Sequence, residues 1–206
     1  TLVIAGVSLY LAHGFNRRTS IALLSTLITL GLAIGLSELF VRWASLTGRG
    51  SEEAFLLQYG ELAFIDLRGL LLAGIVIGTL GVLDDITTAQ TAVVGELKHA
   101  NPKLSKYELY KRALIVGKEH IASLVNTLVL AYVGAALPLF VLFSNFNSVP
   151  WWVALNSEVV AEEFMRTIIG SCALVLAVPI ATYLASVLLS KDDSEEIARV
   201  GHGHSH

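Results

Sequence analysis

The chain has few charged residues and a single cysteine. Only 15% of its 206 residues are charged and 54% are hydrophobic, whereas about a quarter of an average soluble domain is charged. The net charge of −3 argues against nucleic-acid binding, because that activity depends on a strongly basic surface. Cys172 stands alone, which excludes an internal disulfide and a CxxC metal site. These absences indicate a membrane protein.

Long apolar runs predict that the chain crosses the bilayer several times. A hydrocarbon core of about 30 Å requires about 20 apolar residues in a helix. The first run, Leu2 to Ala12, is too short to cross alone, as if the sequence began inside a helix. The predicted fold class is all-α, a polytopic transmembrane helical bundle of about five spans, with a transmembrane domain at 1–190. We expect the complete spans at 19–43, from 68 to 83 or beyond, from a basic segment to about 143, and at 167–189.

The loops between these spans differ in charge. Segments 44–66 and 144–166 are acidic, and the first holds a short apolar stretch, Ala54 to Leu57, that predicts an interfacial helix. Segment 95–118 is basic, and Ser105 and Glu108 within it have capping-box spacing, which predicts a surface helix leading into the fourth span. Basic loops remain in the cytoplasm. We therefore expect 13–18 and 95–118 to be cytoplasmic and the acidic loops to lie outside.

Two adjacent acidic residues follow the apolar part of the third span. Asp84 and Asp85 come after about 15 residues without a charge. A charge at such a depth costs free energy unless a partner, water or an ion meets it, so it is a functional-site hypothesis. The candidate ion or proton site consists of the polar residues at similar depth on the third and fourth spans: Asp84, Asp85, Thr87, Thr88, Gln90, Glu119, His120 and Asn126.

Two placements of this cluster remain open. The third helix can end at Asp84, which leaves both polar groups at the cytoplasmic interface. It can also continue to about Val94, which places them about 10–15 Å inside, at about 1.5 Å rise per residue. Oxygen ligands of this kind suit a hard cation, and His120 could carry protons. A simpler interpretation is that Asp84 or Asp85 pairs with Lys118 or Arg112 and that the Asn126 side chain joins two helices.

Several of these residues resemble a known family. Five short motifs are similar to those of the YibE/F-like family of multi-span membrane proteins. They are Gly81-Val-Leu-Asp-Asp-Ile-Thr, Asn101-Pro, Ser105-x-x-Glu108-Leu-Tyr, His120-Ile-Ala-Ser and Asn126-Thr-Leu-Val-Leu-Ala-Tyr. The resemblance is strongest between Gly78 and Pro138. It implies a bacterial or archaeal plasma membrane and an anchor with an extracytoplasmic segment before the bundle. It implies no reaction.

Three functions fit the sequence. The first is a transporter or channel component that moves a cation, a proton or a small solute past Asp84 and Asp85. The second is a metal-dependent intramembrane enzyme; a paired-aspartate hydrolase is disfavoured because adjacent residues point about 100° apart on a helix. The third is a non-catalytic scaffold whose segment 98–118 binds anionic lipid or a cytoplasmic partner. We favour the transporter.

Two further features complete the predictions. The polar tail, 191–206, ends in Gly-His-Gly-His-Ser-His, and alternating histidines of this kind bind transition metals weakly. A flexible end with no role is the simpler interpretation of that tail. The lipid bilayer is the expected partner of the spans, and a homo-oligomer is one arrangement that such a bundle can adopt.

Overall fold

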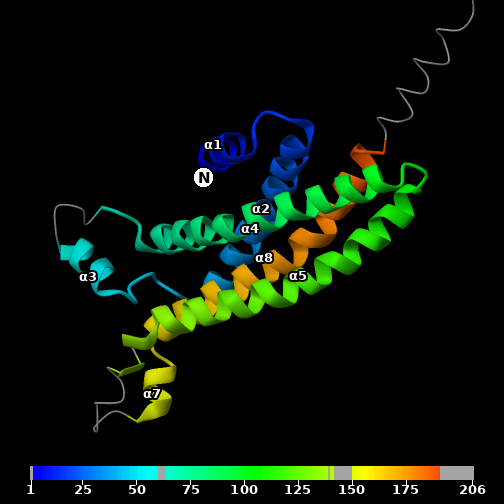
Figure 1. Ribbon diagram of the computed structural model, residues 1–206. Coiled ribbons are helices and arrows are strands. Elements are labelled where there is room, and N and C mark those ends of the chain that lie inside the picture. The colour runs from blue at the N-terminus through cyan, green and yellow to red at the C-terminus, as the bar shows by residue number, and fades with distance from the viewer. Residues whose placement is uncertain (1, 60–63, 139, 142–149, 191–206) are drawn as a thin grey trace, which may run out of the picture. The chain divides into compact units, whose positions relative to one another are not determined.

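The computed structural model describes residues 2–59, 64–138, 140–141 and 150–190 (Figure 1). No strand occurs in this part of the chain, and the fold is all-α as the sequence predicts. The histidine tail, 191–206, lies outside the described residues. The helices are α1 (Leu2–His13), α2 (Arg17–Trp43), α3 (Glu52–Tyr59), α4 (Leu67–Ala100), α5 (Lys106–Ala135), α7 (Trp151–Leu155) and α8 (Glu158–Leu188).

Four helices are long and apolar enough to cross a membrane. They are α2, α4, α5 and α8, with 27, 34, 30 and 31 residues. A 30-residue helix is about 45 Å long and exceeds a hydrocarbon core of about 30 Å, so each of these helices also extends outside the core. The apolar helix α1 has 12 residues, shorter than a span, as expected.

The helix boundaries decide between several expectations. Helix α4 continues through Asp84 to Ala100, so the placement in which the third helix ends at Asp84 is wrong. The helix expected around Ala54 to Leu57 is confirmed as α3, and its location at the membrane interface stays a prediction. The loop predicted to run to Arg166 is wrong in its second half, because α8 already begins at Glu158. Helix α5 ends at Ala135, and 142–149, where we expected the span to end, lie outside the described residues.

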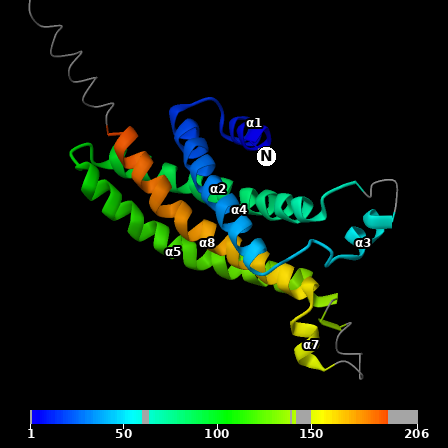
Figure 2. The ribbon, with the colours of Figure 1, turned by 180° about the vertical axis from the view of Figure 1, so that it is seen from behind.

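The chain forms two compact units. The first contains 1–29, 80–122 and 174–206, and the second contains 30–79 and 123–173. In the first unit, the start of α2, the end of α4, the start of α5 and the end of α8 lie side by side (Figures 1 and 2). Their shared core consists of Ile21, Val94, Leu104, Leu109, Ala113 and Ala185. This unit carries seven of the eight predicted site residues, all except Asn126.

A tight turn joins α1 to α2 in the first unit. Gly14 follows the last residue of α1 with φ of +74°, the left-handed conformation in which helices often end and which glycine adopts most easily. Asn16 then caps α2, because its Oδ1 accepts a hydrogen bond of 2.9 Å from the Thr19 amide. This turn fixes the position of His13, at the end of α1, beside the start of α2.

The second unit is held by apolar packing and by acidic side chains of α8, among them Glu158. Val41, Leu46, Leu71 and Ile75 pack with Ile169 in its core. At the start of α8, the Glu158 carboxylate accepts hydrogen bonds from the amides of Thr47 and Gly48 and from the Thr47 hydroxyl. A carboxylate bound by several amides fixes the loop after α2 against α8.

The capping box at the start of α5 is present as predicted. The Ser105 hydroxyl accepts a hydrogen bond of 3.3 Å from the Glu108 amide, and the Glu108 carboxylate accepts one of 3.1 Å from the Ser105 amide. The Ser105 hydroxyl also donates to this carboxylate at 2.8 Å. These bonds fix the beginning of α5 outside the apolar part of the helix.

Candidate functional site

Asp84 lies near the middle of the 34-residue helix α4, inside a helix that is apolar enough to span a membrane. The side chain is half-buried, and its Oδ1 is inaccessible and has no hydrogen-bond partner among the described residues. An unsatisfied buried polar atom costs about 1–3 kcal/mol. Asp85, the next residue, is exposed. The two carboxylates therefore occupy different environments, as their angular separation on a helix predicts.

Thr87 and Gln90, one and two turns after Asp84, join helices. The hydroxyls of Thr87 and Thr26 lie 2.7 Å apart and connect α4 to α2. Gln90 is 1% exposed, and its Nε2 donates to the Ala113 carbonyl at 2.8 Å and to the Thr182 hydroxyl at 2.7 Å. Both side chains thus satisfy polar atoms between apolar helices, which holds the backbone around Asp84 in place.

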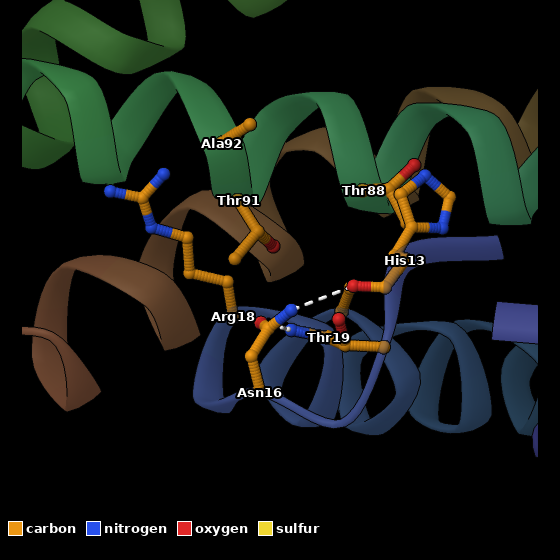
Figure 3. Close-up of a pocket in the computed structure, with 8 residues that line it drawn as sticks. His13, Asn16, Arg18, Thr19, Thr88, Thr91 and Ala92 are labelled. Atoms are coloured by element: carbon orange, nitrogen blue, oxygen red, sulfur yellow. Dashed lines mark hydrogen bonds between the residues drawn. The ribbon is translucent and has the colours of Figure 1, made fainter. Parts of the chain in front are cut away.

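A pocket of about 150 Å³ lies between the α1–α2 turn and α4 (Figure 3). Its polar lining comes from both sides, and the complete lining is His13, Asn16, Arg18, Thr19, Ala22, Thr88, Thr91 and Ala92. The volume is sufficient for several water molecules, at about 30 Å³ each. Figure 3 shows the His13 imidazole beside Thr88, and Thr88 donates a hydrogen bond of 2.7 Å to the Asp84 carbonyl one turn earlier.

His13 is the functional candidate that the sequence analysis missed. His13 and Asp85 both lie close enough to Asp84 to interact with it electrostatically. The imidazole thus lines the pocket and also lies in the neighbourhood of the Asp84 carboxylate. The signal in the sequence was weak, because a histidine before a glycine turn is typical of a helix end. Its proximity to Asp84 depends on the fold of a chain segment about 70 residues away.

Arg18 supplies positive charge at the edge of the pocket. Its Nη1 lies 2.9 Å from a Glu96 oxygen, and both side chains are largely exposed. The guanidinium passes over Gly95, where a Cβ atom would lie 2.8 Å from it. An exposed ion pair of this kind contributes little stability. Its effect is to hold the guanidinium beside the pocket lined by His13.

The comparison with protein families shows the family of the chain. The family model described as YibE/F-like protein matches residues 1–191. The chain belongs to the YibE/F-like family. No curated protein and no solved structure matches it. A YibE/F-like protein with four helices of spanning length is an integral membrane protein.

The α5 residues of the predicted site are exposed in this YibE/F-like protein. Glu119 and His120 lie at the surface of the first unit, and Asn126 lies at the surface of the second. Within the described residues, no group of three or more His, Cys, Asp and Glu side chains is close enough to hold a metal ion. The joint site of α4 and α5 residues therefore stays a prediction.

Proposed function

We propose that this YibE/F-like protein is a transporter or channel component that moves a cation, a proton or a small solute across the membrane. The supporting observation is the unpartnered buried oxygen of Asp84, in the middle of a spanning helix. A carboxylate in that position is stabilised by a proton, by water or by a cation. Exchange of such a species at Asp84 is the central step of the proposal.

In this proposal the pocket brings water near the carboxylate, because Thr88 in its lining lies one turn after Asp84. Its lining combines one imidazole, one guanidinium, one amide and three threonine hydroxyls. The positive Arg18 at its edge disfavours a bare divalent cation there, so the pocket is better suited to water or an uncharged solute. The two ring nitrogens of His13 can donate or accept hydrogen bonds with water in the pocket. In this proposal Asp85, Glu119, His120 and Asn126 are additional polar groups of the pathway.

The proposal includes a location in the plasma membrane and an orientation of the protein in it. Arg17 and Arg18 begin α2, and the basic segment 95–118 lies at the same end of this unit, where Arg18 pairs with Glu96. The positive-inside rule places both in the cytoplasm of a cell whose plasma membrane holds the protein. The pocket then opens on the cytoplasmic side.

A second function is supported by a separate observation. Five basic side chains of the segment between α4 and the apolar part of α5 are exposed: Lys103, Lys106, Lys111, Arg112 and Lys118. Near an anionic membrane each contributes about 1 kcal/mol of attraction. A scaffold that binds anionic lipid or a cytoplasmic partner is the alternative that this surface favours.

A flux measurement tests the transport proposal. The purified protein is reconstituted into liposomes that carry a pH-sensitive dye or a dye sensitive to monovalent or divalent cations. The expected result is a flux of one of these ions above that of protein-free liposomes. If the inserted, folded protein moves neither protons nor any cation under a gradient or a membrane potential, ion transport is wrong. Binding that depends on lipid charge and salt would then support the scaffold.

A further inference from the structure

Helix α5 is the least covered of the four spanning helices. In its most apolar 18-residue window only 17% is buried, compared with 39–50% in the windows of α2, α4 and α8. The uncovered part in the second unit includes polar side chains: Ser123, Asn126 and Thr127 are all exposed. An amide facing lipid lacks hydrogen-bond partners, which is costly in a hydrocarbon environment.

Four of the exposed residues of α5 have heptad spacing. Ser123, Asn126, Leu130 and Val133 are spaced three, four and three residues apart, the a/d spacing of a helix pair. All four are exposed, Leu130 by 71% and Val133 by 48%. They lie on one side of the helix, whereas Leu128, on the opposite side, is buried. We call these four residues the α5 seam.

We propose that the α5 seam is an interface for a second copy of this chain, bound as a parallel helix pair. A second copy in the same membrane has the same orientation, so each seam residue meets its own equivalent at the same depth. The Asn126 amide both donates and accepts hydrogen bonds, and so it can pair with the Asn126 of the copy. This amide pair favours the register in which the two Asn126 side chains meet.

The ends of the seam agree with this arrangement. Gly134 follows Val133, and a Cβ atom there would meet nothing within 4 Å, so the surface beside the seam is open to a neighbouring backbone. Glu119 precedes Ser123 by one turn on the same side of α5. Two glutamates facing each other would repel, so the close contact begins at Ser123.

Site-directed cross-linking in native membranes tests the seam. Cys172 is first replaced by alanine, which leaves a cysteine-free chain. Single cysteines then replace Asn126, Leu130 or Val133. The matched control is Ala131→Cys, because Ala131 is also exposed but points at least about 100° away from each of these three residues. Oxidation should give covalent dimers at the three seam positions and several-fold fewer at Ala131.

A second measurement separates a specific pair from random collision. In liposomes, fluorescence transfer between two labelled copies should fall in Asn126→Leu, with a loss of about 3- to 30-fold in the association constant, and should be largely retained in Asn126→Gln. Equal cross-linking at Ala131 and Leu130 would overturn the proposal. The absence of cross-links at every seam position that a membrane-permeant maleimide labels would also overturn it. Cross-links to other proteins in place of dimers would also overturn it.

Discussion

The Nε2 atom of Gln90 lies 2.7 Å from the hydroxyl of Thr182, deep between α4 and α8. The same nitrogen donates to the Ala113 carbonyl, so one side chain joins three helices. In a membrane protein an interhelical hydrogen bond contributes about 0.6 kcal/mol on average and up to about 1.7 kcal/mol. Gln90, two turns after Asp84, therefore has the structural role of joining these helices, independent of any transported species.

Replacement of Gln90 should destabilise the first unit. Gln90→Leu removes both hydrogen bonds, and we expect the free energy of unfolding to fall by about 1–2 kcal/mol. Unfolding in sodium dodecyl sulfate, followed by circular dichroism, measures this change. Thr182→Val is the matched control, because it removes one of the two bonds and should cost less. Equal stability of wild type and Gln90→Leu would show that these bonds contribute nothing.

A second prediction concerns the close contact of α5 with α8. A Cβ atom on Gly117 would lie 2.5 Å from Val178 Cγ1 and 2.8 Å from Gln90 Oε1. Gly117→Ala should therefore force these helices apart and cost about 1–3 kcal/mol. Gly81→Ala is the control in the same unit, since a Cβ atom there meets nothing within 4 Å. In the same unfolding assay, Gly117→Ala should have a clearly lower free energy of unfolding than Gly81→Ala. The reverse order would contradict this close packing of α5 on α8.

The third prediction concerns the pH dependence of the capping box. Glu108 lies in the polar first turn of α5, outside the apolar part, and hydrogen bonds from the Ser105 hydroxyl and amide hold its pKa below the ordinary value. A lowered pKa in the folded state means that the cap stabilises the helix above the unfolded pKa. That contribution is lost as the pH falls through the folded pKa.

Removal of the Ser105 hydroxyl tests this relationship. In Ser105→Ala the titration midpoint of the Glu108 carboxyl should move up toward that of an ordinary glutamate. Carbon NMR of the protein labelled at glutamate carboxyls, in detergent micelles, follows this midpoint. An identical midpoint in wild type and variant would show that the capping hydrogen bonds are absent in solution.

Local patterns in the sequence were sufficient to predict much of the fold. Capping-box spacing between Ser105 and Glu108 predicted the start of α5. The start of α8 was not predicted, because Glu158, Glu162 and Glu163 are typical of a solvated loop. In the structure Glu158 and Glu162 accept amide hydrogen bonds from the loop after α2, and Glu163 lies 3.0 Å from Arg166. Those partners are distant in the sequence or depend on the helix itself.

The candidate site was predictable only in part. An acidic pair after an apolar run singled out Asp84 and Asp85, and continuation of the helix placed Asp84 within a span. The partners of Thr87 and Gln90 are Thr26, Thr182 and a backbone carbonyl, 61, 92 and 23 residues away in sequence. No local pattern specifies such contacts. The approach of His13 to Asp84 likewise depends on how the α1–α2 turn packs on α4.

The fourth prediction tests the central claim, that exchange of a proton or cation occurs at Asp84. Asp84→Asn and Asp85→Asn form a matched pair, because each removes one charge with little change in shape and only Asp84 has the buried unpartnered oxygen. The measurement is ion flux into liposomes under one gradient, with insertion and helix content shown equal. Asp84→Asn should reduce the flux by at least about 100-fold, which corresponds to a transport barrier raised by about 3 kcal/mol. Asp85→Asn should reduce the flux less. Wild-type flux in a folded Asp84→Asn protein would contradict the account.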